Sequence, residues 1–153
     1  MHNPLYLLVS IGPFTAIAPY HRRVLNGVTR AMRNRFDPVR RIFIHELTGS
    51  LDLARFKAAQ IACYVGDDPS QFRNVLWDIG EHRLLFPYAD IVHDDAPFLR
   101  TLADRRPAGR TAFATSSQTN LVMLRNLERA HAWTTEWRYF DGTADAMRWL
   151  GER

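Results

Sequence analysis

The apolar run at residues 74–79 constrains the fold more than any other stretch of the chain. Its hydrophobic residues follow one another almost without interruption, and turn-forming residues bound the run at 68–70 and at Gly80. A run of this kind predicts a strand that is buried on both faces of a mostly parallel sheet. Helix-like segments at 53–65 and 88–105 flank it, so the sequence predicts an α/β fold in which helices cover this strand.

The residues before this run predict a β-hairpin. Residues 32–36 and 39–47 are rich in strand formers, and the Asp-Pro pair at 37–38 between them is a turn signal, because proline pre-sets the backbone angle at the second turn position. Ser50 or Asp52 is then placed to cap the helix that follows.

After the run, two prolines shape the next element. Pro87 is well placed as the first residue of a helix. Pro97 interrupts the helical pattern and predicts a kink near residues 94–96, after which Phe98 returns to the core.

The remaining sequence continues the alternation. We expect a strand at 110–114, a helix that extends to residue 132, an edge strand at 134–139 and a final short helix that begins at 142–143. The long helix carries an apolar stripe of Leu121, Leu124 and Leu127. The order β-β-α-β-α-β-α-β-α predicts parallel neighbours with right-handed crossovers and one antiparallel strand, supplied by the hairpin, at an edge.

The amino-terminal segment differs from the rest of the chain. Residues 4–20 are apolar, but Gly12, Pro13 and Pro19 interrupt them, and the stretch is shorter than the roughly 20 residues that span a bilayer. A secretory signal places positive charge ahead of its apolar core, whereas here the arginines follow it. We expect residues 1–31 to be an extension outside the folded unit, which leaves one domain at 32–153, with Met32 as the native initiator. The alternative is an extra strand or arm that packs on the sheet.

The charge distribution argues against a nucleic-acid partner. Of the net charge of +4, the first 31 residues contribute +3 through Arg22, Arg23 and Arg30, so the rest of the chain carries only +1. Beyond this segment, arginines are interleaved with acidic residues, and no phosphate-binding stripe is expected.

Two residue counts bear on location and source. Cys63 is the only cysteine, which excludes an internal disulfide and fits a reducing cytoplasm. Lys57 is the only lysine beside many arginines, which indicates a GC-rich and therefore bacterial genome.

Four stretches together resemble a known family. They are 36–38 with 47–49, the strand 75–78, the segment 109–113 and the ending 138–150. In order and spacing they resemble the STAS domains, named for sulfate transporters and anti-sigma factor antagonists, and within them the bacterial SpoIIAA-like stand-alone proteins. The resemblance covers residues 32 to the end and implies a regulatory, non-enzymatic domain that binds a protein partner.

The resemblance also implies a phosphorylation switch, from which this sequence departs. Antagonists of that family accept a phosphate on a serine or threonine just after the central strand, but residues 79–87 contain no hydroxyl group. Ser116 is the best substitute as a candidate phosphoacceptor. Related folds are similar to CRAL-TRIO lipid-binding domains, which implies as an alternative a small apolar ligand in a pocket lined by Phe86, Ile91 and Phe98.

Candidate site residues gather where two strands end. Asp78 and Gly80 follow the central strand, and Thr115, Ser116 and Ser117 follow the next one, at an edge where open α/β sheets place their working surfaces. The three hydroxyl residues precede a helix, so they either cap it or help its N–H groups hold an anion. Asp78 could act as an acid or base, although one carboxylate at a strand end is more often a hydrogen-bond acceptor.

The sequence predicts no cofactor and no metal site. The polar groups at 81–82 and 93–95 lack the spacing of metal ligands and are expected to be solvated at a helix break. Glycine-rich phosphate loops and nucleophile motifs are also missing from the sequence. We therefore expect a cytoplasmic, non-enzymatic interaction module that docks a protein partner around Asp78, Gly80 and Ser116, with the apolar-ligand binder as the alternative.

Overall fold

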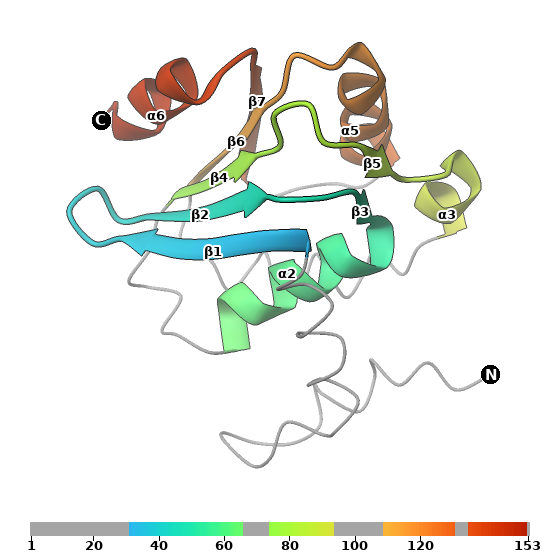
Figure 1. Cartoon of the computed structure of the whole chain (residues 1–153), viewed down its shortest axis with the longest axis horizontal. Coiled ribbons are helices and arrows are strands. Elements are labelled where there is room, and N and C mark those ends of the chain that lie inside the picture. Colours follow the sequence, from blue (N-terminus) through green and yellow to red (C-terminus); the bar gives the residue numbers. More distant parts are fainter. Residues whose placement is uncertain (1–30, 66–73, 94–108, 131–134, 153) are drawn as a thin grey trace.

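The computed structural model describes residues 31–65, 74–93, 109–130 and 135–152, and Figure 1 shows how their elements are arranged. The elements, in chain order, are β1 (Met32–Asp37), β2 (Ile42–Leu47), β3 (Leu51–Asp52), α2 (Leu53–Val65), β4 (Asn74–Asp78), β5 (Leu84–Leu85), α3 (Tyr88–His93), β6 (Arg110–Ala114), α5 (Gln118–Ala130), β7 (Glu136–Phe140) and α6 (Thr143–Gly151).

The main sheet has the strand order β1-β2-β4-β6-β7. β1 is antiparallel to β2, and the other neighbours are parallel. The α/β class, the mostly parallel sheet and the antiparallel edge strand are therefore confirmed. β4 occupies the middle of the sheet, as its continuous apolar sequence predicts, with Val75 between Phe43 on one side and Thr111 on the other.

The strands follow one another across the sheet in the order in which the chain makes them. Right-handed crossovers that all step in one direction place their helices on one face. Side chains of α2, α3 and α5 accordingly share one core cluster, which we call the broad face, and α6 packs on the opposite face, which we call the α6 face. Figure 1 shows α2 and α6 on opposite sides of the sheet.

Alternation along each strand divides its side chains between these two faces. In β4, Val75 and Trp77 enter the broad-face core, whereas Leu76 enters the α6-face core. Both groups are at most 1% exposed, which explains why this strand reads as one continuous apolar run.

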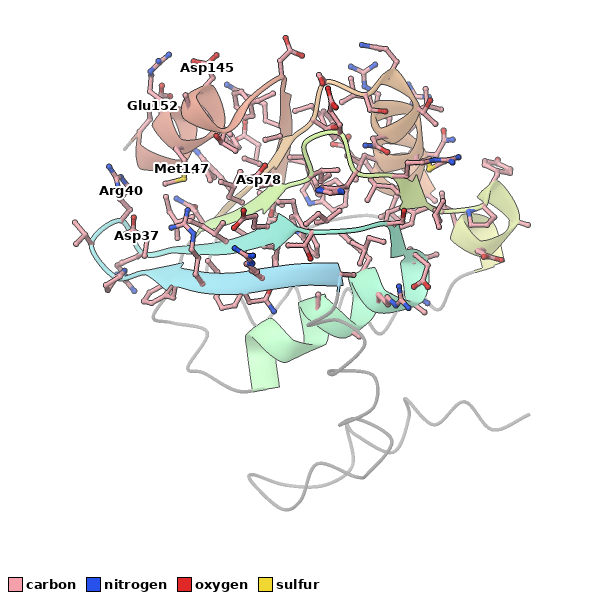
Figure 2. All side chains as sticks on the ribbon, in the orientation of Figure 1. Asp37, Arg40, Asp78, Asp145, Met147 and Glu152 are labelled. Carbon is pink, nitrogen blue, oxygen red and sulfur yellow. The ribbon has the colours of Figure 1, made fainter. Side chains whose placement is uncertain are left out.

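The hairpin turn is longer than the sequence predicts. β2 begins at Ile42 and not at Val39, because the Asp37 carboxylate accepts the backbone N–H groups of Val39 and Arg40, each at 3.0 Å, and Arg41 has φ 57°. Residues 39–41 therefore belong to the turn and not to the strand that the sequence predicts. Figure 2 shows Asp37 and Arg40 at the turn, where their side chains form an ion pair at 3.0 Å.

Helix starts follow the capping chemistry of the sequence. Asp52, one of the two predicted caps, accepts the N–H of Arg55 at 2.8 Å at the start of α2. α3 begins at Tyr88, one residue after the predicted Pro87, whose carbonyl accepts the N–H groups of Asp90 and Ile91. The predicted kink at 94–96 lies outside the described residues.

Two features at the borders of the sheet complete the fold. β3 and β5 pair in parallel as a separate small sheet, with Leu51 opposite Leu84, which the sequence does not predict. Ala31 is buried, and its carbonyl accepts the N–H of Thr48 at 2.8 Å. Residues 1–30 lie outside the described part, so the extension at 1–31 and the domain at 32–153 stay predictions. Within the described ranges, none of the helices combines the length and the apolar character needed to cross a bilayer.

Candidate functional site

The candidate site lies at the carboxyl ends of β4 and β6. These strands are neighbours, and Asp78 is paired in register with Ala114. The two segments stay hydrogen-bonded beyond the ends of the strands, because the N–H groups of Ile79 and Gly80 both donate to the Ala114 carbonyl oxygen at 3.0 Å. The structure thus brings together the two segments that the sequence singles out, 78–80 and 115–117.

A tight turn carries the chain out of β4. Gly80 has φ +58°, a left-handed conformation that glycine adopts without strain, and His82 donates its N–H to the Ile79 carbonyl oxygen at 3.2 Å. Residues 80–83 are all exposed, whereas Ile79 just before them is buried. The turn therefore presents a short polar loop above the edge of the sheet.

Thr115 lies beneath this loop and is fully buried. Its hydroxyl donates to the Gly80 carbonyl oxygen at 2.7 Å and accepts the N–H of Ser117 at 3.2 Å. Of the five residues that the sequence assigns to a binding surface, Thr115 is thus placed to support the loop from within and not to meet a partner.

The two serines that follow Thr115 have different environments. Ser117 is the cap of α5, because its hydroxyl accepts the N–H of Asn120 at 3.3 Å and its carbonyl accepts the N–H of Leu121 at 3.1 Å. Ser116 is exposed beside Thr115. Its exposure is what a modifying enzyme or a protein partner needs, and its role as phosphoacceptor stays a prediction.

Sequence reasoning missed Asn120, which is 2% exposed in the first turn of α5. Its side-chain N–H groups donate to the His82 carbonyl oxygen at 2.8 Å and to the Thr115 hydroxyl oxygen at 3.1 Å, and its side-chain oxygen accepts the N–H of Leu84 at 3.0 Å. A signal was present, since Asn120 precedes Leu124 by four residues and Leu127 by seven and so continues their buried stripe. A polar residue at such a position implies a specific partner.

Asp78 points to the α6 face, where Figure 2 shows it on the same side of the sheet as Met147 of α6. Its neighbour across the β2–β4 pair is Glu46. Burial raises the pKa of the Asp78 carboxyl group, the negative charge of Glu46 raises it further, and the positive charges of Arg35 and His82 act in the opposite direction. The site therefore contains a half-buried carboxylate that takes up a proton more readily than a solvated one.

The residues of the expected apolar pocket fall into two groups. Phe86 and Ile91 are 2% and 0% exposed and belong to the broad-face core, where the Phe86 ring meets that of Phe56 edge to face at 5.3 Å. Phe98 lies outside the described residues. The first two side chains are core residues, and the pocket itself stays a prediction.

The sequence predicts that the polar residues at 81–82 and 93–95 do not form a metal site. Glu81 and His82 are exposed in the loop, and the side chains of residues 93–95 lie outside the described part. Among the residues that the structure describes, no three histidine, cysteine or acidic side chains are grouped as metal ligands. The chemistry that the described site offers is hydrogen bonding by backbone and hydroxyl groups and proton uptake by Asp78.

Comparisons with protein-family models, with curated proteins and with solved structures found no match to this chain.

Proposed function

We propose that the protein is a non-enzymatic, STAS-like regulatory module that binds a protein partner through residues 80–83 and Ser116, which we call the docking surface. The observation that carries this proposal is a contrast at one edge of the sheet: residues 80–83 and Ser116 are exposed, and a buried hydrogen-bond network of Thr115 and Asn120 supports them from beneath.

A surface held in this way is suited to recognition. Loops that must be ordered on binding lose affinity through the entropy of ordering, whereas a loop that is already fixed does not. The four loop residues Gly80, Glu81, His82 and Arg83 are exposed and carry both signs of charge, which favours a polar protein surface as partner over an apolar ligand or a polyanion.

The resemblance to SpoIIAA-like proteins supports the regulatory part of the proposal. It is carried by the hairpin turn, the central strand, the segment at 109–113 and the ending at 138–150. The amino-terminal hairpin, the parallel sheet and the terminal helix on its own face are consistent with that resemblance. In this proposal the partner is cytoplasmic, and Ser116 takes the place of the missing phosphoacceptor after the central strand.

Site-specific photo-crosslinking tests the docking surface. A photoreactive phenylalanine analogue replaces Glu81 or Ser116 in the full chain expressed in its source organism, and Val39 serves as the matched control, because it is 90% exposed at the distant hairpin turn. We expect one discrete crosslinked partner from positions 81 and 116 and none from position 39.

Equal crosslinking from all three positions, or a partner captured only at position 39, would contradict the proposal. A crosslinked partner at position 81 that is lost in Ser116→Glu but retained in Ser116→Ala would support control by a phosphate at this residue, because glutamate supplies negative charge.

A further inference from the structure

Asn120 joins the two parts of the docking surface. From the first turn of α5, its amide reaches the backbone of the 80–84 loop at two points, the His82 carbonyl oxygen and the Leu84 N–H, and a third bond goes to Thr115. Its own backbone N–H is bound by Ser117, the residue after Ser116. One buried side chain thus contacts both segments from below.

The environment of this side chain fits an amide and no other group of its size. Two of its neighbours, the His82 carbonyl oxygen and the Thr115 hydroxyl oxygen, are acceptors in these bonds, because the Thr115 proton is already donated to Gly80. The third neighbour, the Leu84 N–H, is a donor. An ionised aspartate has the same shape but no donor, so it would leave both acceptors facing a negative charge.

We infer that Asn120 is a positioning residue of the docking surface: its amide fixes the 80–83 loop to the amino end of α5, so that both parts hold one arrangement before a partner binds. Its importance for binding rests on the proposed function. The mechanical part of the inference does not, since it follows from the bonds to His82 and Leu84 alone.

Hydrogen exchange of the partner-free full chain tests the mechanical part. The variant is Asn120→Asp, and the control is Asn126→Asp, which makes the same change at a half-buried position of the same helix. The readout is the exchange rate of the Gly80 amide, which joins the loop to β6 by donating to the Ala114 carbonyl oxygen, divided by that of the Phe113 amide within the sheet. The Leu84 amide is unsuitable as a readout, because an aspartate oxygen at position 120 still accepts its N–H. We expect this ratio to rise about tenfold in Asn120→Asp. A buried carboxylate that faces two acceptors destabilises the closed loop, so the loop opens more often. The ratio should stay unchanged in Asn126→Asp.

An unchanged ratio in Asn120→Asp would overturn the inference, and so would an equal acceleration of both amides, because the role would then be general stability. If Asn120→Asp does not fold, Thr115→Val replaces it, because it removes only the hydroxyl group that bonds both the Asn120 amide and the Gly80 carbonyl oxygen. We then expect the same exchange ratio to rise a few-fold.

The yield of crosslinked partner tests whether Asn120 is important for binding. We expect Asn120→Asp to lower the partner yield from position 81 about tenfold, whereas Asn126→Asp leaves it unchanged. A raised exchange ratio with an unchanged yield would overturn the positioning role in docking. A wild-type chain that crosslinks no partner would instead count against the proposed function, and the exchange ratio would still judge the contact between the loop and α5.

Discussion

The two faces of the sheet are stabilised in different ways. On the broad face large aromatic rings interlock: Trp77 lies 4.6 Å from Phe56 and 6.5 Å from Phe113, measured between ring centroids. On the α6 face the sheet offers mainly small and aliphatic side chains, such as Leu76 and Ala112, to a single nine-residue helix. The broad face is therefore stabilised mainly by the close packing of large side chains, whereas the α6 face adds a few directional contacts to a smaller apolar core.

Those contacts are concentrated at one end of α6. The guanidinium groups of Arg110 and Arg138 lie over the Trp149 ring, at 5.0 and 4.8 Å from its centroid, and Asn74 donates its side-chain N–H to the Leu150 carbonyl oxygen at 2.7 Å. Asn74 and Arg110 begin their strands, so the last turn of α6 is anchored at the amino ends of β4 and β6. The opposite, carboxyl ends of the strands carry half-buried Asp78 and the exposed docking surface.

Truncation of a broad-face aromatic residue should have the largest effect. Phe113 is fully buried and contacts Trp77, Trp137 and Tyr139. We expect Phe113→Ala to lower the free energy of unfolding by about 3–5 kcal/mol in urea denaturation, because it leaves a cavity that the surrounding rings cannot fill. A loss below about 1 kcal/mol would mean that this face is not closely packed.

Removal of the α6 anchor should cost less. Asn74 is 8% exposed, and its side chain bonds both the Leu150 carbonyl oxygen and the N–H of Arg110, the latter at 2.9 Å. We expect Asn74→Ala to lower the free energy of unfolding by about 1–3 kcal/mol, since two backbone groups, one in a buried and one in a partly buried bond, lose their partner. Hydrogen exchange should accelerate more in α6 than in α5, and equal acceleration in both helices would contradict a local anchor.

Replacement of Asp78 should have a small effect of opposite sign. Its pKa is raised in the folded protein, so the stability that its proton uptake contributes is present below the unfolded pKa and is lost as the pH rises through the folded pKa. Asp78→Asn should therefore have a higher denaturation midpoint than the wild type at pH 7, and the two midpoints should converge near pH 3. A lower midpoint for Asp78→Asn at pH 7 would show that the ionised carboxylate stabilises the fold.

Most of the scaffold could be predicted because its signals are local. The hairpin, the central position of β4 and the capping of α2 by Asp52 follow from neighbouring residues, although the hairpin turn extends further than its Asp-Pro pair predicts. β3 and β5 could not be predicted, because two-residue strands are too short to show a periodicity.

The candidate site depends more on contacts between distant residues. That Asp78 lies beside Glu46 follows from the register of β2 on β4, which no local pattern encodes. Thr115 and Ser117 look alike in sequence, yet one is buried under Gly80 and the other caps α5. Asn120 was identifiable only as a polar residue on a buried stripe, and its partners at 82 and 84 come from a different part of the chain.

The most direct test of the docking surface is a hydrogen-exchange footprint of the full chain, recorded with and without the partner that crosslinking identifies. We expect slower exchange at residues 80–84 and 116–118 in the complex and no change at residues 39–41 of the hairpin turn. Protection of the hairpin turn without protection of the loop and of the start of α5 would contradict it.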